Sequence, residues 1–109
     1  IKNSEGFYSI RTPSLFEIRA LEQWWRMNKA NSFSEFYEIL KMKALPGYNI
    51  GYADKNDTIF YISNGLIPKR EPGYNWKSVV PGDTTKTLWN STYDTEELPQ
   101  IIQPKSGYF

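Results

Sequence analysis

The residues in this sequence best suited to chemistry are two neighbouring aspartates, Asp54 and Asp57. Such a pair of carboxylates could bind a metal ion or share acid and base roles. Both residues, however, stand in a short polar stretch between two β-rich runs, where aspartate commonly accepts hydrogen bonds from backbone N–H groups. We therefore favour a turn over a metal or acid–base site at this point of the chain.

Hydroxyl and cationic side chains supply the next candidates. The sequence contains no His and no Cys, which excludes Ser-His-Asp and Cys-His nucleophiles, Cys/His zinc sites and disulfides. Ser9 and Ser63 therefore lack a base of the usual kind, and we interpret them as strand and turn residues. Arg11 and Arg70 could clamp an anion, although arginines are more often paired with acidic groups or solvated.

Two adjacent tryptophans, Trp24 and Trp25, fall within a segment that has helical periodicity. Adjacent side chains on a helix point about 100° apart, so both cannot face one core. We expect one tryptophan in the core and the other against a different element or a ligand.

The first predicted helix runs from about Pro13 to Lys29. Pro suits the first helical position, and Ser14 with Glu17 fits a capping box. Apolar residues then recur at helical spacing. This expected apolar stripe comprises Leu15, Ile18, Leu21, Trp25 and Met27.

A second helix is predicted to follow Ser32, which forms a capping-box pattern with Glu35, and to end before Leu45-Pro46-Gly47. Its apolar stripe comprises Phe33, Phe36, Tyr37, Leu40 and Met42. The pattern then changes to β-rich runs over Tyr48–Ala53 and Thr58–Ser63, which predict a hairpin. A shorter run over Gly6–Ile10 could form one more strand.

The remaining third of the chain has little periodicity. Five of the seven prolines lie after Gly65, yet this segment keeps Trp76, Trp89 and other large apolar residues, which disordered linkers usually lack. We expect an ordered but irregular segment. The chain is thus predicted to be one α+β unit over residues 1–109, with a helical part at about 12–44, a hairpin at about 48–64 and an irregular segment over 65–109.

Composition limits the class of protein. A chain of 109 residues fits one small domain. Its 13 basic and 12 acidic residues are interspersed, so there is no basic stripe for a nucleic acid, and we expect no nucleic-acid partner. No apolar run approaches the roughly 18 residues that span a bilayer, so we expect no membrane partner. Because residue 1 is Ile and ordinary sequence follows it, we interpret the chain as an internal piece of a larger protein.

An ordered series of motifs in this sequence resembles the β-chain of the penicillin amidase family, which includes penicillin acylases and acyl-homoserine lactone acylases. The most specific stretch is Asn49–Arg70, with its Tyr-Ala-Asp, turn, second strand and Pro-x-Arg. Further matches are Val80-Pro81-Gly82 followed by Trp89, Glu97-Leu98-Pro99, and the closing run from Gln103 to Tyr108. Arg11 and the helix end at Met27-Asn28-Lys29-Ala30 also align.

This resemblance implies an amide hydrolase with the αββα sandwich of N-terminal nucleophile hydrolases. In that family a Ser at the β-chain N-terminus attacks N-acyl amides, and its own α-amino group serves as the base. Backbone N–H groups and an Asn side chain stabilise the oxyanion. The Ser would lie before Ile1 and the Asn just after Phe109, so the resemblance places no catalytic residue in these residues and implies that they alone are inactive. It also implies a periplasmic or secreted protein.

The resemblance assigns binding roles to two residues of this chain. Trp24 falls at a tryptophan that lines the acyl pocket, and Tyr48 falls at a hydrophobic pocket position. This favours Trp24 as the ligand-facing tryptophan and Trp25 as the core residue. Gly51 departs from the family, which has a bulky residue there, so the identity of the acyl group does not carry over.

A structural calcium occurs in some members of the family. It is held by carboxylates outside the matching region and by one backbone carbonyl, which would correspond to that of Trp76. A member of the family has Pro at that position. The resemblance therefore implies no cofactor within this chain, and a calcium ion only in the parent protein.

Three functional interpretations remain open from the sequence. The first is an acylase acting on penicillins with aryl-acetyl groups or on acyl-homoserine lactones, in which these residues contact the rest of the parent chain. The second is a non-catalytic binding module that uses exposed aromatic residues. The third is a parent protein that has lost its nucleophile and serves as a scaffold.

Overall fold

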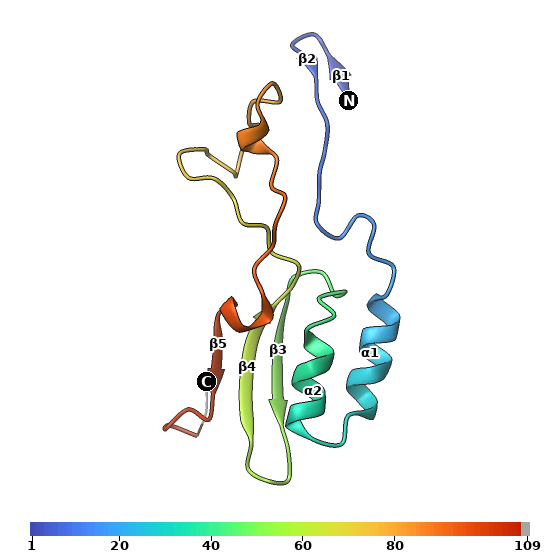
Figure 1. Cartoon of the computed structure of the whole chain (residues 1–109), viewed down its shortest axis with the longest axis vertical. Coiled ribbons are helices and arrows are strands. Elements are labelled where there is room, and N and C mark those ends of the chain that lie inside the picture. Colours follow the sequence, from blue (N-terminus) through green and yellow to red (C-terminus); the bar gives the residue numbers. More distant parts are fainter. Residues whose placement is uncertain (108–109) are drawn as a thin grey trace.

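Two helices lie against one face of a three-stranded antiparallel sheet in the computed structural model, which describes residues 1–107 (Figure 1). This arrangement confirms the predicted α+β class. The molecule measures 58 Å along its longest axis and 30 and 21 Å across, because an N-terminal arm and much of the later irregular segment extend away from the helices and sheet. Tyr108, the last residue of the closing motif, lies outside the described residues.

The sheet is built around a hairpin. Strand β3 spans Tyr48–Ala53 and strand β4 spans Ile59–Asn64, within a residue of the predicted bounds. The two strands pair antiparallel from Tyr48 opposite Asn64 to Ala53 opposite Ile59. A third strand, β5 at Gln100–Ile102, pairs with the other edge of β4. The hairpin prediction is confirmed, and the irregular segment contributes a strand that the sequence pattern did not indicate.

Helix α1 is shorter than predicted and spans Ala20–Lys29. The expected start at Pro13 and the capping box from Ser14 to Glu17 are wrong, because residues 13–16 form a turn and residues 17–19 have no regular secondary structure. The Glu17 carboxylate instead accepts a hydrogen bond of 2.7 Å from the backbone N–H of Arg19, just before the helix.

Helix α2 spans Phe33–Leu40 and begins as predicted. The Ser32 hydroxyl accepts a hydrogen bond of 3.2 Å from the backbone N–H of Glu35. In return, the Glu35 carboxylate accepts one of 2.8 Å from the N–H of Asn31. The first bond pairs a backbone donor that the first helical turn leaves free, and the second fixes the residue before the N-cap against the helix.

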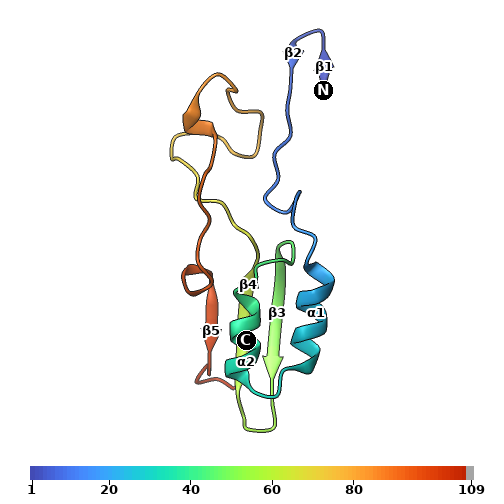
Figure 2. The same ribbon diagram turned by 45° about the vertical axis from the view of Figure 1, so that its right-hand side comes forward.

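The core forms where the two helices meet the strands (Figure 2). Alternate residues of β3 and β4 face the helices, and Phe60 and Ile62 are fully buried there. Phe33 of α2 packs edge-on against Phe60, with ring centroids 5.1 Å apart. The buried apolar residues of this cluster are Met27, Phe36, Leu40, Leu45, Ile50, Phe60, Ile62 and Leu98.

The apolar stripe predicted for the first helix is largely wrong. Leu15, Ile18, Leu21 and Trp25 are more than half exposed, and of the predicted set only Met27 is buried. The stripe that faces the core consists instead of Ala20, Gln23, Met27 and Ala30. The helical spacing was predicted correctly, but the stripe was assigned to the wrong face of the helix, because the polar residue Gln23 occupies a core position.

Short elements and ion pairs order the rest of the chain. The arm is a small hairpin of β1, Lys2–Asn3, and β2, Gly6–Phe7, so only part of the predicted Gly6–Ile10 strand forms. The irregular segment contains 3-10 turns at Thr85–Thr87 and Thr95–Glu97. Three ion pairs fasten the second turn to the helical part and to the segment after β4. They are Lys41–Glu96, Lys43–Asp94 and Lys69–Glu97.

Candidate functional site

The two residues predicted to contact a substrate lie against each other. The rings of Trp24, on α1, and Tyr48, the first residue of β3, meet edge to face, with centroids 6.1 Å apart and planes at 68°. Trp24 is 43% exposed and Tyr48 is 46% exposed, so each ring keeps a large apolar surface free. We call this pair the aromatic wall.

Helix α1 sets the direction of Trp24. Ala20, Gln23 and Met27 face the core, and Trp24 therefore projects from the flank of the helix beside β3. Asn28, one turn later, donates a hydrogen bond of 3.0 Å from its side chain to the backbone carbonyl of Trp24.

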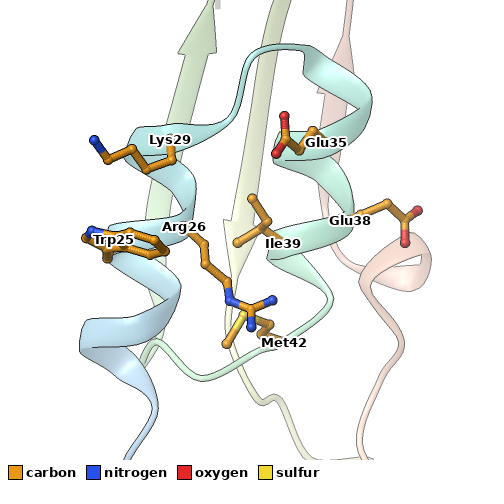
Figure 3. Close-up of a pocket in the computed structure, with 7 residues that line it drawn as sticks. All are labelled: Trp25, Arg26, Lys29, Glu35, Glu38, Ile39 and Met42. Carbon is orange, nitrogen blue, oxygen red and sulfur yellow. The ribbon is translucent and has the colours of Figure 1, made fainter.

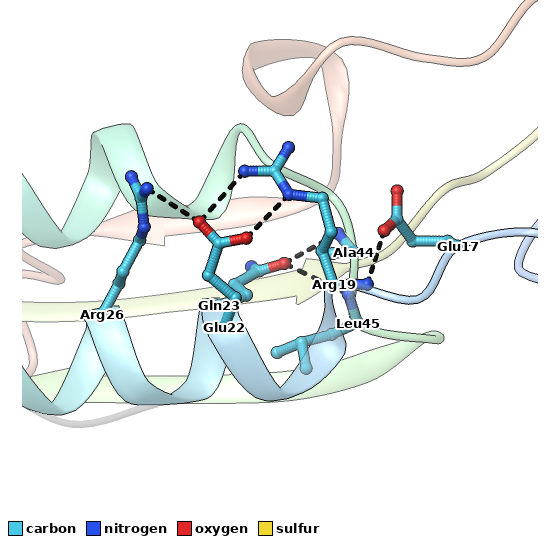
Figure 4. A network of polar contacts seen from close by, with 7 residues as sticks. All are labelled: Glu17, Arg19, Glu22, Gln23, Arg26, Ala44 and Leu45. Atoms are coloured by element: carbon cyan, nitrogen blue, oxygen red, sulfur yellow. Dashed lines mark hydrogen bonds and ion pairs between the residues drawn. The ribbon is translucent and has the colours of Figure 1, made fainter.

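The segment between α2 and β3 sets the position of Tyr48. The chain leaves α2 through Lys43, which adopts a positive φ of 48°, and Ala44 and Leu45 are buried directly after it. Gln23, which is fully buried, accepts hydrogen bonds on one amide oxygen from the backbone N–H groups of both Ala44 and Leu45, at 2.7 and 3.1 Å (Figure 4). The side chain of Gln23 thus joins α1 directly to the segment that leads to Tyr48.

The other side of Tyr48 is fixed by close backbone packing. A Cβ atom added at Gly65 would lie 3.0 Å from the Cα atom of Gly47, so a glycine at position 65 allows the two backbones to approach closely. Asn64, which pairs with Tyr48 across the hairpin, is fully buried. Within residues 1–107 its side-chain amide has no hydrogen-bond partner. The sequence suggested a turn at Ser63–Gly65, whereas Asn64 ends strand β4.

Trp25 does not lie in the core, so that prediction is wrong. It is 61% exposed and lines an open groove of about 530 Å³ between the two helices (Figure 3). Cationic side chains come from α1 and acidic ones from α2 around an apolar floor. Besides Trp25, the lining residues are Arg26, Lys29, Glu35, Glu38, Ile39 and Met42. The core-facing side of α1, where Trp25 was expected, carries the fully buried Gln23 instead.

The aspartates of the hairpin act in a turn, as favoured from the sequence. The Asp54 carboxylate accepts hydrogen bonds from the backbone N–H groups of Asn56 and Thr58, at 2.8 and 3.1 Å, and from the Tyr52 hydroxyl, at 2.9 Å. Burial by itself raises the pKa of Asp54, but these hydrogen bonds outweigh it, and the pKa lies below its ordinary 3.8. Burial, and then the bond to Asp54, raises the pKa of Tyr52. Asp57 adopts a positive φ of 61° in the same turn.

The arginine candidates lie over tryptophan rings. Arg11 stacks on Trp89 at 4.1 Å and Arg70 on Trp76 at 5.4 Å from the ring centroid, so each has an aromatic partner. Ser63 donates its backbone N–H to the carbonyl of Pro99.

Residues 1–107 bring together no group of three or more His, Cys, Asp or Glu side chains that could hold a metal ion. The indole N–H of Trp76 donates to the carbonyl of Glu71 within an exposed turn. In the same part of the chain, no helix has the length and apolar character needed to cross a membrane.

Comparison with known proteins gives matches over nearly the whole chain. The family model described as penicillin amidase matches residues 2–109. Penicillin G acylase of Escherichia coli is 34% identical over 92 residues, which cover 84% of this chain and 11% of that protein. Acyl-homoserine lactone acylase PvdQ of Pseudomonas fluorescens (strain Pf0-1) is 22% identical, over 93% of this chain and 15% of that protein.

A solved structure shows the same fold. Thermostable penicillin G acylase from Alcaligenes faecalis superposes with a TM-score of 0.78 and is 21% identical, over 99% of this chain and 21% of the other. The chain therefore spans between about a tenth and a fifth of the length of the proteins that it matches.

Proposed function

Because the chain belongs to the penicillin amidase family, we propose that these residues form part of an acylase that cleaves N-acyl amides. Its substrates would be penicillins with aryl-acetyl groups or acyl-homoserine lactones with fatty chains, the classes to which the named relatives point. In this proposal the described residues supply scaffold and one side of the acyl pocket, and the chemistry takes place on residues outside them.

The aromatic wall is the observation that carries this proposal. Two residues from separate elements, Trp24 and Tyr48, place their rings 6.1 Å apart while each stays more than 40% exposed. Aromatic rings gain free energy by burying apolar area and by edge-to-face contact with another ring. A half-exposed pair of this kind suits the apolar acyl group of an amide substrate, whether that group is an aryl ring or a fatty chain.

The proposed chemistry needs no histidine. A Ser at the N-terminus of the parent's β-chain would attack the amide carbonyl, and its free α-amino group would take the hydroxyl proton. Backbone N–H groups and an Asn side chain would stabilise the oxyanion. The amine product leaves first, and water then releases the acyl group. Because the Ser and the Asn of this route would lie outside the 109 residues, we expect these residues alone to hydrolyse no amide.

Exposed apolar side chains support a partner within the parent protein. Phe16 and Ile18 are each 90% exposed and Leu21 is 83% exposed, along the segment that enters α1. Clusters of apolar residues at a surface commonly mark a contact with another protein segment. We propose that the remainder of the parent chain covers this surface, and that the parent is periplasmic or secreted.

A structural calcium is proposed only for the parent. By the resemblance to the family its carboxylate ligands would lie outside these residues, and Trp76 could add at most its backbone carbonyl. No step of the proposed reaction uses this ion.

The full-length protein that contains these residues provides the test. It should release p-nitroaniline from phenylacetyl or fatty-acyl p-nitroanilides, and replacement of the β-chain N-terminal Ser by Ala should abolish the release. Binding of the free acids without turnover by the natural protein would instead support the non-catalytic binding module. Neither turnover nor binding would support the scaffold interpretation.

A further inference from the structure

Gln23 is a polar residue at a core position. It is completely buried and lies on the stripe of α1 that also carries Ala20 and Met27. Burying an amide costs free energy unless its polar atoms are hydrogen-bonded. Within residues 1–107 the Nε2 atom of Gln23 has no hydrogen-bond partner, so the amide contributes through its oxygen alone.

The amide oxygen binds two consecutive backbone N–H groups, those of Ala44 and Leu45. Both residues are buried, at 2% and 1% exposure, so water does not reach these donors. The left-handed turn at Lys43 directs the chain away from α2 immediately before them. Gln23 is thus the acceptor that holds this turn against α1.

The same two elements carry the aromatic wall. Trp24 follows Gln23 directly on α1, and Tyr48 begins β3 only a few residues after Leu45. The packing of Gly47 against Gly65 holds Tyr48 from the hairpin side. The Gln23 side chain spans from α1 to this turn (Figure 4) and so joins the two segments that carry the rings.

We infer that Gln23 is a positioning residue that sets the separation of Trp24 and Tyr48, and thereby the size of acyl group that the protein accepts. This inference rests on the proposed function, since it assigns a role within the acyl pocket. Gln23 does not itself touch the substrate, because it is fully buried.

Two substitutions of similar length separate the hydrogen bond from the volume. Gln23→Glu keeps a side-chain oxygen that can accept from both N–H groups, and complete burial favours its neutral, protonated form, which avoids a buried charge. Gln23→Met keeps the length and fills the space, but its thioether is only a weak acceptor. Gln23→Met therefore frees the turn from α1, whereas Gln23→Glu keeps it attached.

The test measures kcat and KM of the full-length protein and of both variants on phenylacetyl, hexanoyl and decanoyl p-nitroanilides. In Gln23→Met we expect the ratio of KM values between acyl groups to change by about fourfold or more, the effect of gaining or losing apolar contact with one CH₂ group when the rings change their separation. Gln23→Glu should keep the natural ratio. A purely structural role would lower apparent kcat through loss of folded enzyme and leave the KM ratios unchanged, and that result would overturn the inference. A shift of equal size in Gln23→Glu would overturn it too.

A second measurement separates this inference from the proposed function. Crystal structures of the full-length protein and of Gln23→Met would give the separation of the Trp24 and Tyr48 rings directly. If the natural protein cleaves none of the amides, the proposed function fails, and an altered ring separation would still establish Gln23 as the positioning residue. An unchanged separation would refute the positioning role whatever the activity.

Discussion

Replacing Trp24 by Ala tests the aromatic wall most directly. Trp24 is 43% exposed, and a tryptophan offers up to about 250 Å², so an acyl group could cover roughly 100 Å² of it. At about 25 cal/mol per Å² this contact contributes about 2.5 kcal/mol. Full coverage then corresponds to a loss of roughly seventyfold in kcat/KM, and half coverage to roughly eightfold.

The adjacent tryptophan provides a matched control. Trp25→Ala removes the same side chain from the same helix, but Trp25 lies in the groove between α1 and α2, away from Tyr48. We expect Trp25→Ala to change kcat/KM less than about twofold, and the loss in Trp24→Ala to appear mainly in KM, as for an interaction equally strong in substrate and transition state.

The assay is steady-state hydrolysis of phenylacetyl and hexanoyl p-nitroanilides by the full-length protein. Circular dichroism confirms that both variants are folded. Equal losses in the two variants, or no loss in Trp24→Ala, would show that Trp24 does not form the acyl-binding surface.

Three further predictions concern stability and assembly. Gly65→Ala should lower the free energy of unfolding of the full-length protein by about 1–3 kcal/mol, because the new Cβ would lie 3.0 Å from the backbone of Gly47. As a control, Gly82→Ala, with open space around it, should leave the midpoint of urea unfolding unchanged. The pKa of Asp54 is below 3.8 in the folded state, so its carboxylate stabilises the turn above that pH, and this stabilisation is lost as the pH falls through the lowered pKa of the folded state. NMR titration of the carboxyl group should give the lowered pKa, and Asp54→Asn should remove the pH dependence that this loss adds to the exchange of the Thr58 amide proton. The 109 residues expressed alone should bind an apolar dye or associate, because Phe16 and Ile18 are each 90% exposed; a monomer that melts sharply without binding dye would contradict this.

Elements specified by neighbouring residues were predicted well from the sequence. The α2 start depends on Ser32 and Glu35, and the hairpin depends on alternation around the turn at Asp54, so local patterns were sufficient. The resemblance to the family named Trp24 and Tyr48 separately as pocket residues and did not indicate that they meet; the structure places their ring centroids 6.1 Å apart.

Features that depend on distant partners were not predicted. The role of Gln23 arises from two N–H groups on a different element, so its polar side chain concealed the true buried stripe and led to the wrong placement of Trp25. Strand β5 has only three residues, and its pairing with β4 joins segments far apart in the chain, so periodicity gave no sign of it.

The residues that form and position the aromatic wall lie close together in the sequence, and this has a consequence for engineering. Trp24, Gln23, the turn that Gln23 holds and Tyr48 all lie within residues 20–48, and the one support of Tyr48 named above that lies outside this stretch is the strand end at Asn64 and Gly65. Exchanging residues 20–48 together with Asn64 and Gly65 between relatives should therefore transfer acyl preference with its support, whereas exchanging Trp24 and Tyr48 alone would place new rings on a spacing made for different side chains.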